Sequence, residues 1–210
     1  MGYNRIFVHR QTGMGKRLGL LIIGLIFKAN FLSAQEVIKY DVSIAGISIG
    51  EMVAKREKKG EELHYELKSN VSFWFFGKIN LDYLTKVVYQ GKRLNKANVS
   101  SKTNRGNFQS DILWNGDHYK IKSSNYKHEL DTVIQRPFLF SAAVFYFEEP
   151  VQAKEFLAEA YGLPSPIKKV KDYYEVNVNG NTNRFYYVDG KLEKAVMEFP
   201  IKNYVVKRKQ

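Results

Sequence analysis

Apolar and polar residues alternate along most of the chain between residues 36 and 134, as expected for β-strands with one buried face and one wet face. The cleanest example runs from Leu63 to Phe73, where Tyr65, Leu67 and Val71 share one face. The same reasoning predicts strands at 38–44, 47–56, 63–73, 78–89, 94–103, 108–114, 118–124 and 126–134. Gly50 lies inside the second of these strands and predicts a bulge or a close backbone approach.

The strand pattern returns near the C-terminus, with predicted strands at 167–170, 172–178, 183–188, 191–199 and 204–207. Residues 155–161 fit either a strand or a helical turn. Asn-Gly and Asp-Gly pairs at 115–116, 179–180 and 189–190 predict hairpin turns. Because no long helical stripe is present, the predicted fold class is all-β. We expect one domain, residues 35–210, with a curved antiparallel sheet of about 12 strands closing into an open barrel or a sandwich.

An apolar run from Arg136 to Pro150 separates the two groups of strands. Its centre, residues 138–147, carries no charge and is too short to span a bilayer as a helix, which takes about 20 apolar residues. The run is therefore predicted to be buried. Helical spacings such as Phe138, Ala142 and Phe145 favour one short buried helix near 138–147 over a strand.

The first 34 residues have the three parts of a secretory signal peptide. A basic region is followed by ten apolar residues, 18–27, and by a small-residue end at Ala34. This pattern predicts export to the periplasm or beyond, with cleavage after Ala34. Either Met1 or Met14 can be the true start, and an uncleaved membrane anchor is the alternative interpretation.

Charge and cysteine content narrow the possible partners. The formal net charge of the 210 residues is +12, and removal of the five basic residues of the leader leaves +7. These charges are spread over many strands, so nucleic acid is not an expected partner, while attraction to anionic lipid or polysaccharide stays open. The absence of cysteine excludes disulfides and a lipidated N-terminal cysteine. Polar residues on one face of nearly every strand argue against a transmembrane barrel.

No motif for catalysis, metal binding or cofactor binding is present, so we predict neither an enzyme nor a cofactor. The predicted mature chain contains three histidines, His64, His118 and His128, which lie in separate strands without a metal-ligand spacing. The adjacent Glu148 and Glu149 precede a proline at the end of the apolar run, where a solvated boundary is more usual than a catalytic pair.

Large aromatic residues are the strongest candidates for a binding site. In the segment from Phe73 to Phe76, successive side chains point to opposite faces of a strand, so both faces cannot be solvated comfortably. Core packing, a ligand groove and a membrane-touching rim all explain this pattern. The hypothetical ligand-binding residues are Phe73, Trp74, Phe75, Phe76, Trp114, Phe138, Phe140, Phe145 and Phe147.

The order of motifs resembles a known family. A Tyr-x-Val strand at Tyr40, a Gly-Ile-x-Ile-Gly turn at 46–50, a segment ending Tyr-Phe-Glu-Glu-Pro at 146–150 and a closing Phe-Tyr-Tyr-Val-Asp-Gly at 185–190 are similar to those of uncharacterised exported Bacteroidota proteins with a domain of unknown function. More distantly, the chain resembles a larger group of periplasmic β-rich proteins. The resemblance covers nearly all of 36–206. It implies a curved antiparallel sheet or open barrel with a short inserted helix, and it implies no activity.

Three functional hypotheses follow from these observations. The first is an exported cell-envelope protein that binds a lipid or another apolar molecule in an aromatic groove. The second is a non-catalytic module that pairs an edge strand with an envelope protein. The third is an enzyme of unrecognised type, which would need convergent polar groups in a pocket.

Overall fold

The structure is a computed structural model that describes residues 1–2, 35–74, 77–104, 106–125, 128–198 and 202–210. Almost all of the predicted signal peptide, residues 3–34, lies outside the described residues. The strands are β1 (Glu36–Ile44), β2 (Ile47–Lys59), β3 (Glu62–Trp74), β4 (Lys78–Gln90), β5 (Arg93–Thr103), β6 (Gly106–Trp114), β7 (Tyr119–Asn125), β8 (His128–Ile134), β9 (Glu155–Ala158), β10 (Leu163–Val170), β11 (Tyr173–Val178), β12 (Asn181–Val188), β13 (Lys191–Met197) and β14 (Tyr204–Arg208).

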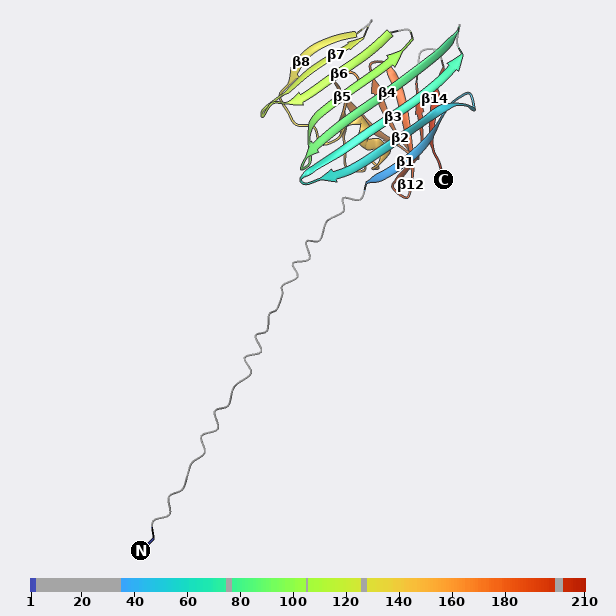
Figure 1. The fold of residues 1–210 in the computed structure, drawn as a ribbon. Coiled ribbons are helices and arrows are strands. Elements are labelled where there is room, and N and C mark those ends of the chain that lie inside the picture. The colour runs from blue at the N-terminus through green and yellow to red at the C-terminus, as the bar shows by residue number, and fades with distance from the viewer. Residues whose placement is uncertain (3–34, 75–76, 105, 126–127, 199–201) are drawn as a thin grey trace. The chain divides into compact units, whose positions relative to one another are not determined.

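All these strands form one antiparallel sheet in the order β8-β7-β6-β5-β4-β3-β2-β1-β14-β13-β12-β11-β10-β9. In Figure 1, β1 to β8 form a broad curved layer, and the C-terminal strands, orange to red, lie behind it. The prediction of an antiparallel all-β fold is confirmed, with 14 strands in place of about 12. The predicted closure is wrong: within the described residues β8 and β9 are the two edges of an open sheet.

The C-terminal part of the sheet contacts the N-terminal part through a turn and side chains. The turn after β9 lies against the inner face of β7, where Ser123 Oγ donates a hydrogen bond of 3.0 Å to the carbonyl of Ala160. Gly162 closes this turn with a φ of +65°, and a Cβ there would overlap the side chain of Ile121. This contact is therefore made by a turn and side chains, without a strand ladder.

The segment between β8 and β9 fills the inside of the curved sheet. Near its start, the carbonyls of Phe138 and Phe140 accept hydrogen bonds of 2.9 and 3.0 Å from the N–H groups of Leu94 and Leu157. These bonds limit the predicted helix near 138–147 to a single 3₁₀ turn, η1 (Ala142–Tyr146). The predicted burial is confirmed, because Ala143 and Phe145 are fully enclosed.

The two ends of the strands differ in how they are covered. We name each end after a glycine in one of its turns. The Gly91 end has the β2–β3 and β4–β5 turns, and the Gly46 end has the β1–β2 and β11–β12 turns. The segment 136–154 covers the Gly91 end, where β8 ends and β9 begins. At the Gly46 end the turn at 159–162 enters the barrel. Most inward-facing side chains there are half-buried, whereas those toward the Gly91 end are mostly buried.

Gly50 confirms its predicted role. It has a φ of +154°, and a Cβ at this position would overlap the backbone carbonyl of Asn70 on β3. The β1–β2 register shifts beside it, between Val42 and Ser43. Only glycine lets the two backbones approach this closely. Among the described residues, no helix is long and apolar enough to cross a membrane.

Candidate functional site

The aromatic residues of the apolar run, which were predicted to bind a ligand, are packed in the core. Phe145 lies at the centre, stacked on Phe185 with 4.3 Å between ring centroids and edge-on to Phe140 and Phe156, at 5.0 Å each. Phe138 and Phe147 are also buried. The rings of this run fill the space in which they were predicted to line a groove.

The other predicted aromatics are separated from this cluster. Trp114 packs edge-on to Tyr119 at the Gly91 end, with 4.7 Å between ring centroids. Trp74 is 78% exposed on the outer face of β3. Phe73 points inward at the Gly46 end and is half-buried. Phe75 and Phe76 lie outside the described residues.

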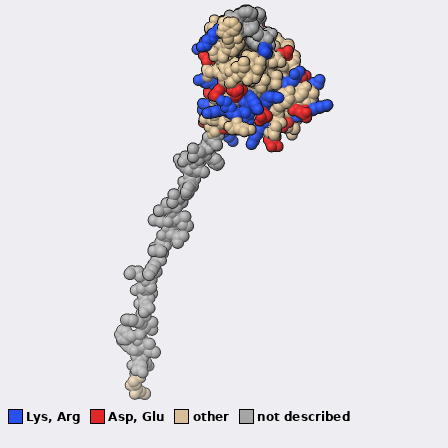
Figure 2. Space-filling view, turned by 90° about the vertical axis from the view of Figure 1, so that its right-hand side faces the viewer, with Lys and Arg blue, Asp and Glu red and all other residues tan. Residues whose placement is uncertain are grey.

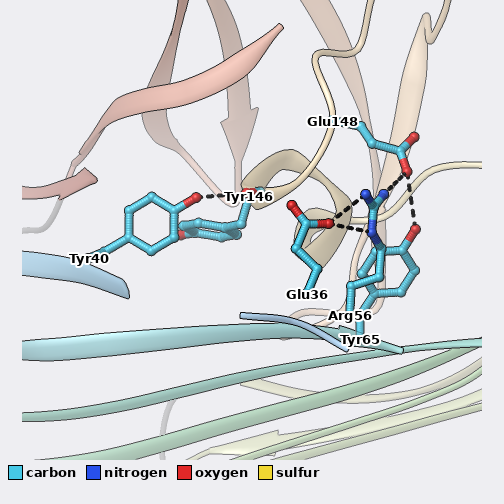
Figure 3. A network of polar contacts seen from close by, with 6 residues as sticks. All are labelled: Glu36, Tyr40, Arg56, Tyr65, Tyr146 and Glu148. Carbon is cyan, nitrogen blue, oxygen red and sulfur yellow. Dashed lines mark hydrogen bonds and ion pairs between the residues drawn. The ribbon is translucent and has the colours of Figure 1, made fainter. Parts of the chain in front are cut away.

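An ion-pair network attaches the end of the apolar run to the sheet (Figure 3). Arg56 on β2 contacts Glu36 through Nε and Nη2, at 3.0 and 2.6 Å, and Glu148 through Nη1 at 2.5 Å. Burial and the nearby Glu148 raise the pKa of Tyr65 to about 12, so its hydroxyl stays neutral. In the same view Tyr40 donates a hydrogen bond of 2.7 Å to the carbonyl of Tyr146.

Glu149 attaches the same segment to the other half of the sheet. It accepts a hydrogen bond of 2.8 Å from the hydroxyl of Tyr174 on β11, and Lys169 Nζ lies 3.4 Å away. Adjacent carboxylates therefore bind opposite walls of the fold. This arrangement explains the Glu-Glu-Pro motif as a structural clamp at the Gly91 end.

We expect Arg56→Ala to lower the free energy of unfolding by about 1 kcal/mol, since the guanidinium is partly exposed and screened. Chemical denaturation at low and high salt measures the change. The matched control is Lys55→Ala, which removes an exposed side chain of the same strand as Arg56, 3.9 Å from Glu66 on β3. Equal losses in the two variants would contradict the clamp.

A buried carboxylate lies beneath the 3₁₀ turn. Glu159 is 2% exposed and accepts hydrogen bonds of 2.9 Å from the N–H groups of both Ala142 and Ala143. Burial raises the pKa of Glu159 above its ordinary value of 4.5, although these bonds lower it in part. Its backbone belongs to the turn that enters the barrel at the Gly46 end.

Small hydroxyl side chains form a patch on the inner face of β3 to β7. In one cross-strand row Thr85 pairs with Val99, Val99 with Ser110 and Ser110 with Ser123. The next row toward the Gly46 end consists of Ser69, Tyr83, Ser101 and Phe108. The hydroxyl of Ser110 is fully buried and has no hydrogen-bond partner among the described residues. Small polar side chains replace large apolar ones here, so this region of the interior is polar.

Three tyrosines from distant parts of the sheet converge beside this patch. The pKa of Tyr83 on β4 is raised, mainly by burial. The nearby Tyr204, Glu159 and Tyr161 raise this pKa further. Burial and Tyr161 raise the pKa of Tyr204 on β14 to about 12. All three tyrosines are nevertheless half-buried and not fully enclosed. Because their pKa values are raised, Tyr83 and Tyr204 are neutral at physiological pH.

Apolar side chains surround these hydroxyls at the Gly46 end. Phe73, Leu81 and Met197 point inward, pack against the core and stay half-buried. The ring of Phe108 lies 6.5 Å from that of Tyr161. We call this set the Gly46-end chamber: Ser69, Phe73, Leu81, Tyr83, Ser101, Phe108, Tyr161, Met197 and Tyr204.

Sequence reasoning found only Phe73 of this chamber. A signal was available for Ser69, because it occupies an apolar-face position in the cleanest alternating strand. Glu159 carries no such signal, since its burial depends on a contact with η1 that the local sequence does not encode. Among the described residues, no group of three metal-ligating side chains converges.

An open barrel-like antiparallel sheet, with one end plugged by an internal segment and the other lined by half-buried side chains, places this chain among the barrel-like β proteins. The chain belongs to the family defined by the domain of unknown function DUF6134, whose model matches residues 40–209. No curated protein matches it.

The fold is similar to the crystal structure of a beta-barrel-like protein of the domain of unknown function DUF1849 from Brucella abortus. The TM-score is 0.52, with 11% identity over 85% of this chain and 96% of that chain. This likeness extends to the fold alone.

Proposed function

We propose that this chain is an exported cell-envelope protein that holds an apolar or amphipathic small molecule, such as a lipid, in the Gly46-end chamber. Export rests on the leader-like sequence of residues 1–34. Binding rests on one observation: Tyr83, Tyr161 and Tyr204 stay half-buried at the Gly46 end, where Tyr83 is the cross-strand partner of Ser69 and Ser101. We infer a hollow between these half-buried side chains, because concave sites with a few polar groups are where small molecules bind.

The composition of the chamber favours an amphipathic ligand. Phe73, Leu81 and Met197 offer apolar contacts, and the neutral Tyr83 and Tyr204 offer hydroxyl donors to acceptor oxygens of a ligand. The unpartnered hydroxyl of Ser110 lies deeper along the same sheet. A molecule with an apolar body and an uncharged oxygen-containing group satisfies both kinds of surface.

Filling the chamber is expected to abolish binding. Ser69→Phe adds a ring on the inner face of β3, beside Tyr83, and should weaken saturable binding of an apolar fluorophore at least ~10-fold, because the ring occupies the ligand's volume. Fluorescence titration measures this. The matched control is Lys68→Phe, which places the same ring on the outer face of the same strand and should leave affinity unchanged.

Native mass spectrometry of the protein purified gently from its own host provides the first independent test. A native mass that exceeds the denatured mass by a discrete small-molecule mass, removable by organic extraction, supports a carried ligand. Failure of the fluorophore to saturate, together with a bare native mass, would eliminate the proposal.

The open edge of β8 supports the second candidate, an interaction module. β8 pairs with β7 and has no other strand partner among the described residues. An exposed edge can accept a strand from another protein. Partner-dependent protection of the β8 amides from hydrogen exchange would favour this function over ligand binding.

A further inference from the structure

The rim at the Gly46 end carries two exposed apolar side chains. Trp74 is 78% exposed at the end of β3, and Ile47 is 71% exposed at the start of β2. The β2–β3 ladder ends with Gly50 opposite Val71, so both residues lie beyond the last pair at the same end of neighbouring strands, Trp74 on the outer face and Ile47 paired with Ile44 of β1. Trp74 is the only aromatic among the large side chains exposed in the described parts of the chain.

Basic side chains accompany this pair. Lys78 is the cross-strand partner of Trp74 in the β3–β4 ladder. Three exposed lysines of the described chain lie at this end, Lys78, Lys102 and Lys202. None of them forms an ion pair with another described residue. The acidic Asp82 and Glu198 also lie at this end, but each accepts a hydrogen bond within the protein, from Asn70 and from the N–H of Thr182.

We propose that this rim, formed by Ile47, Trp74 and Lys78, docks onto an anionic lipid bilayer, with the Gly46-end chamber facing the lipid. An indole ring favours the boundary between water and lipid, where its apolar body and its N–H are both accommodated. Each lysine near an anionic surface strengthens binding roughly fivefold. The net charge of +7 on residues 35–210 also attracts the protein to an anionic surface at long range.

Other exposed features do not single out a second docking face. Figure 2 shows acidic and basic side chains intermixed over the visible face of the β domain. Val151, at 72% exposure, and Leu139, at 66%, lie in the segment that covers the Gly91 end, without an aromatic neighbour of similar exposure in the described residues. Val151 matches Ile47 in exposure and therefore serves as a control.

Vesicle flotation tests the proposal. The protein is expressed with its own leader and purified as the cell has processed it. Binding to vesicles of equal phosphatidylglycerol and phosphatidylcholine should exceed binding to pure phosphatidylcholine at least ~10-fold, and should weaken in about 1 M salt, where the Debye length is ~3 Å. Trp74→Ala and Ile47→Ser should each reduce binding about fivefold or more, because each removes apolar surface that enters the lipid. Val151→Ser should not change it.

The orientation is tested by the fluorescence of Trp74. Brominated lipid should quench the exposed indole in the wild type, and Trp74→Phe should remove this quenching while retaining most of the binding. Equal binding of wild type and Trp74→Ala, or no preference for anionic vesicles, would overturn the proposal.

The docked rim is where a ligand would enter, so membrane docking rests on the proposed function. Docking and ligand binding can nevertheless fail separately. Ser69→Phe should lose fluorophore binding and keep vesicle binding, whereas Trp74→Ala should show the opposite pattern.

Discussion

Replacing Phe145 by alanine is expected to lower the free energy of unfolding by about 3–5 kcal/mol, the usual cost of removing a fully buried phenyl ring. Phe145 is completely buried and contacts Phe140 of its own segment, Phe156 on β9 and the stacked Phe185 on β12. The ring joins the internal segment to the C-terminal strands. Its loss therefore leaves a cavity at the point where the two parts of the core meet.

Urea denaturation followed by circular dichroism measures this loss. Leu139→Ala is the matched control: it lies in the same segment but is 66% exposed, so we expect a change within about 0.5 kcal/mol. A loss below ~1 kcal/mol for Phe145→Ala would mean that the internal segment is not part of the cooperative core.

Removing the buried carboxylate of Glu159 is the second large expected effect. Glu159→Ala leaves the N–H groups of Ala142 and Ala143 without their acceptor, and we expect a loss of about 2–4 kcal/mol. Glu159→Gln is the nearly isosteric comparison, since its single amide oxygen can still accept from one of the two N–H groups. Its stability should fall between those of the wild type and the alanine variant near neutral pH.

The pH dependence of stability provides a separate test of Glu159. Burial raises the pKa of this carboxyl above 4.5 in the folded state, so the folded protein binds the proton more tightly than the unfolded chain. The contribution of Glu159 to stability is thus greatest below pH 4.5 and declines as the pH rises through the raised pKa. The difference between wild type and Glu159→Gln should shrink over that range. A difference that grows with pH would contradict a raised pKa.

Local pattern was sufficient to predict the sheet. The alternation in 63–73 and the turn pairs at 179–180 and 189–190 encode strands and hairpins through side-chain period and positive φ, which are properties of neighbouring residues. The extended Pro164 to Pro166 lies in β10 for the same reason. In contrast, the run at 138–147 has helical spacings but forms only one 3₁₀ turn, because the carbonyls of Phe138 and Phe140 at its start are bonded to the N–H groups of Leu94 and Leu157.

The sequence by itself determined that this protein is an antiparallel all-β chain with a buried apolar run between its two groups of strands, because periodicity and turn chemistry act over a few residues. The tertiary structure alone decided which of its aromatic side chains became core and which stayed accessible. Phe145 and Phe73 are alike in sequence, yet one meets rings from three segments and the other lies at a half-buried end. The convergence of Tyr83, Tyr161 and Tyr204 likewise arises only when the sheet curves and brings residues 121 positions apart to one interior.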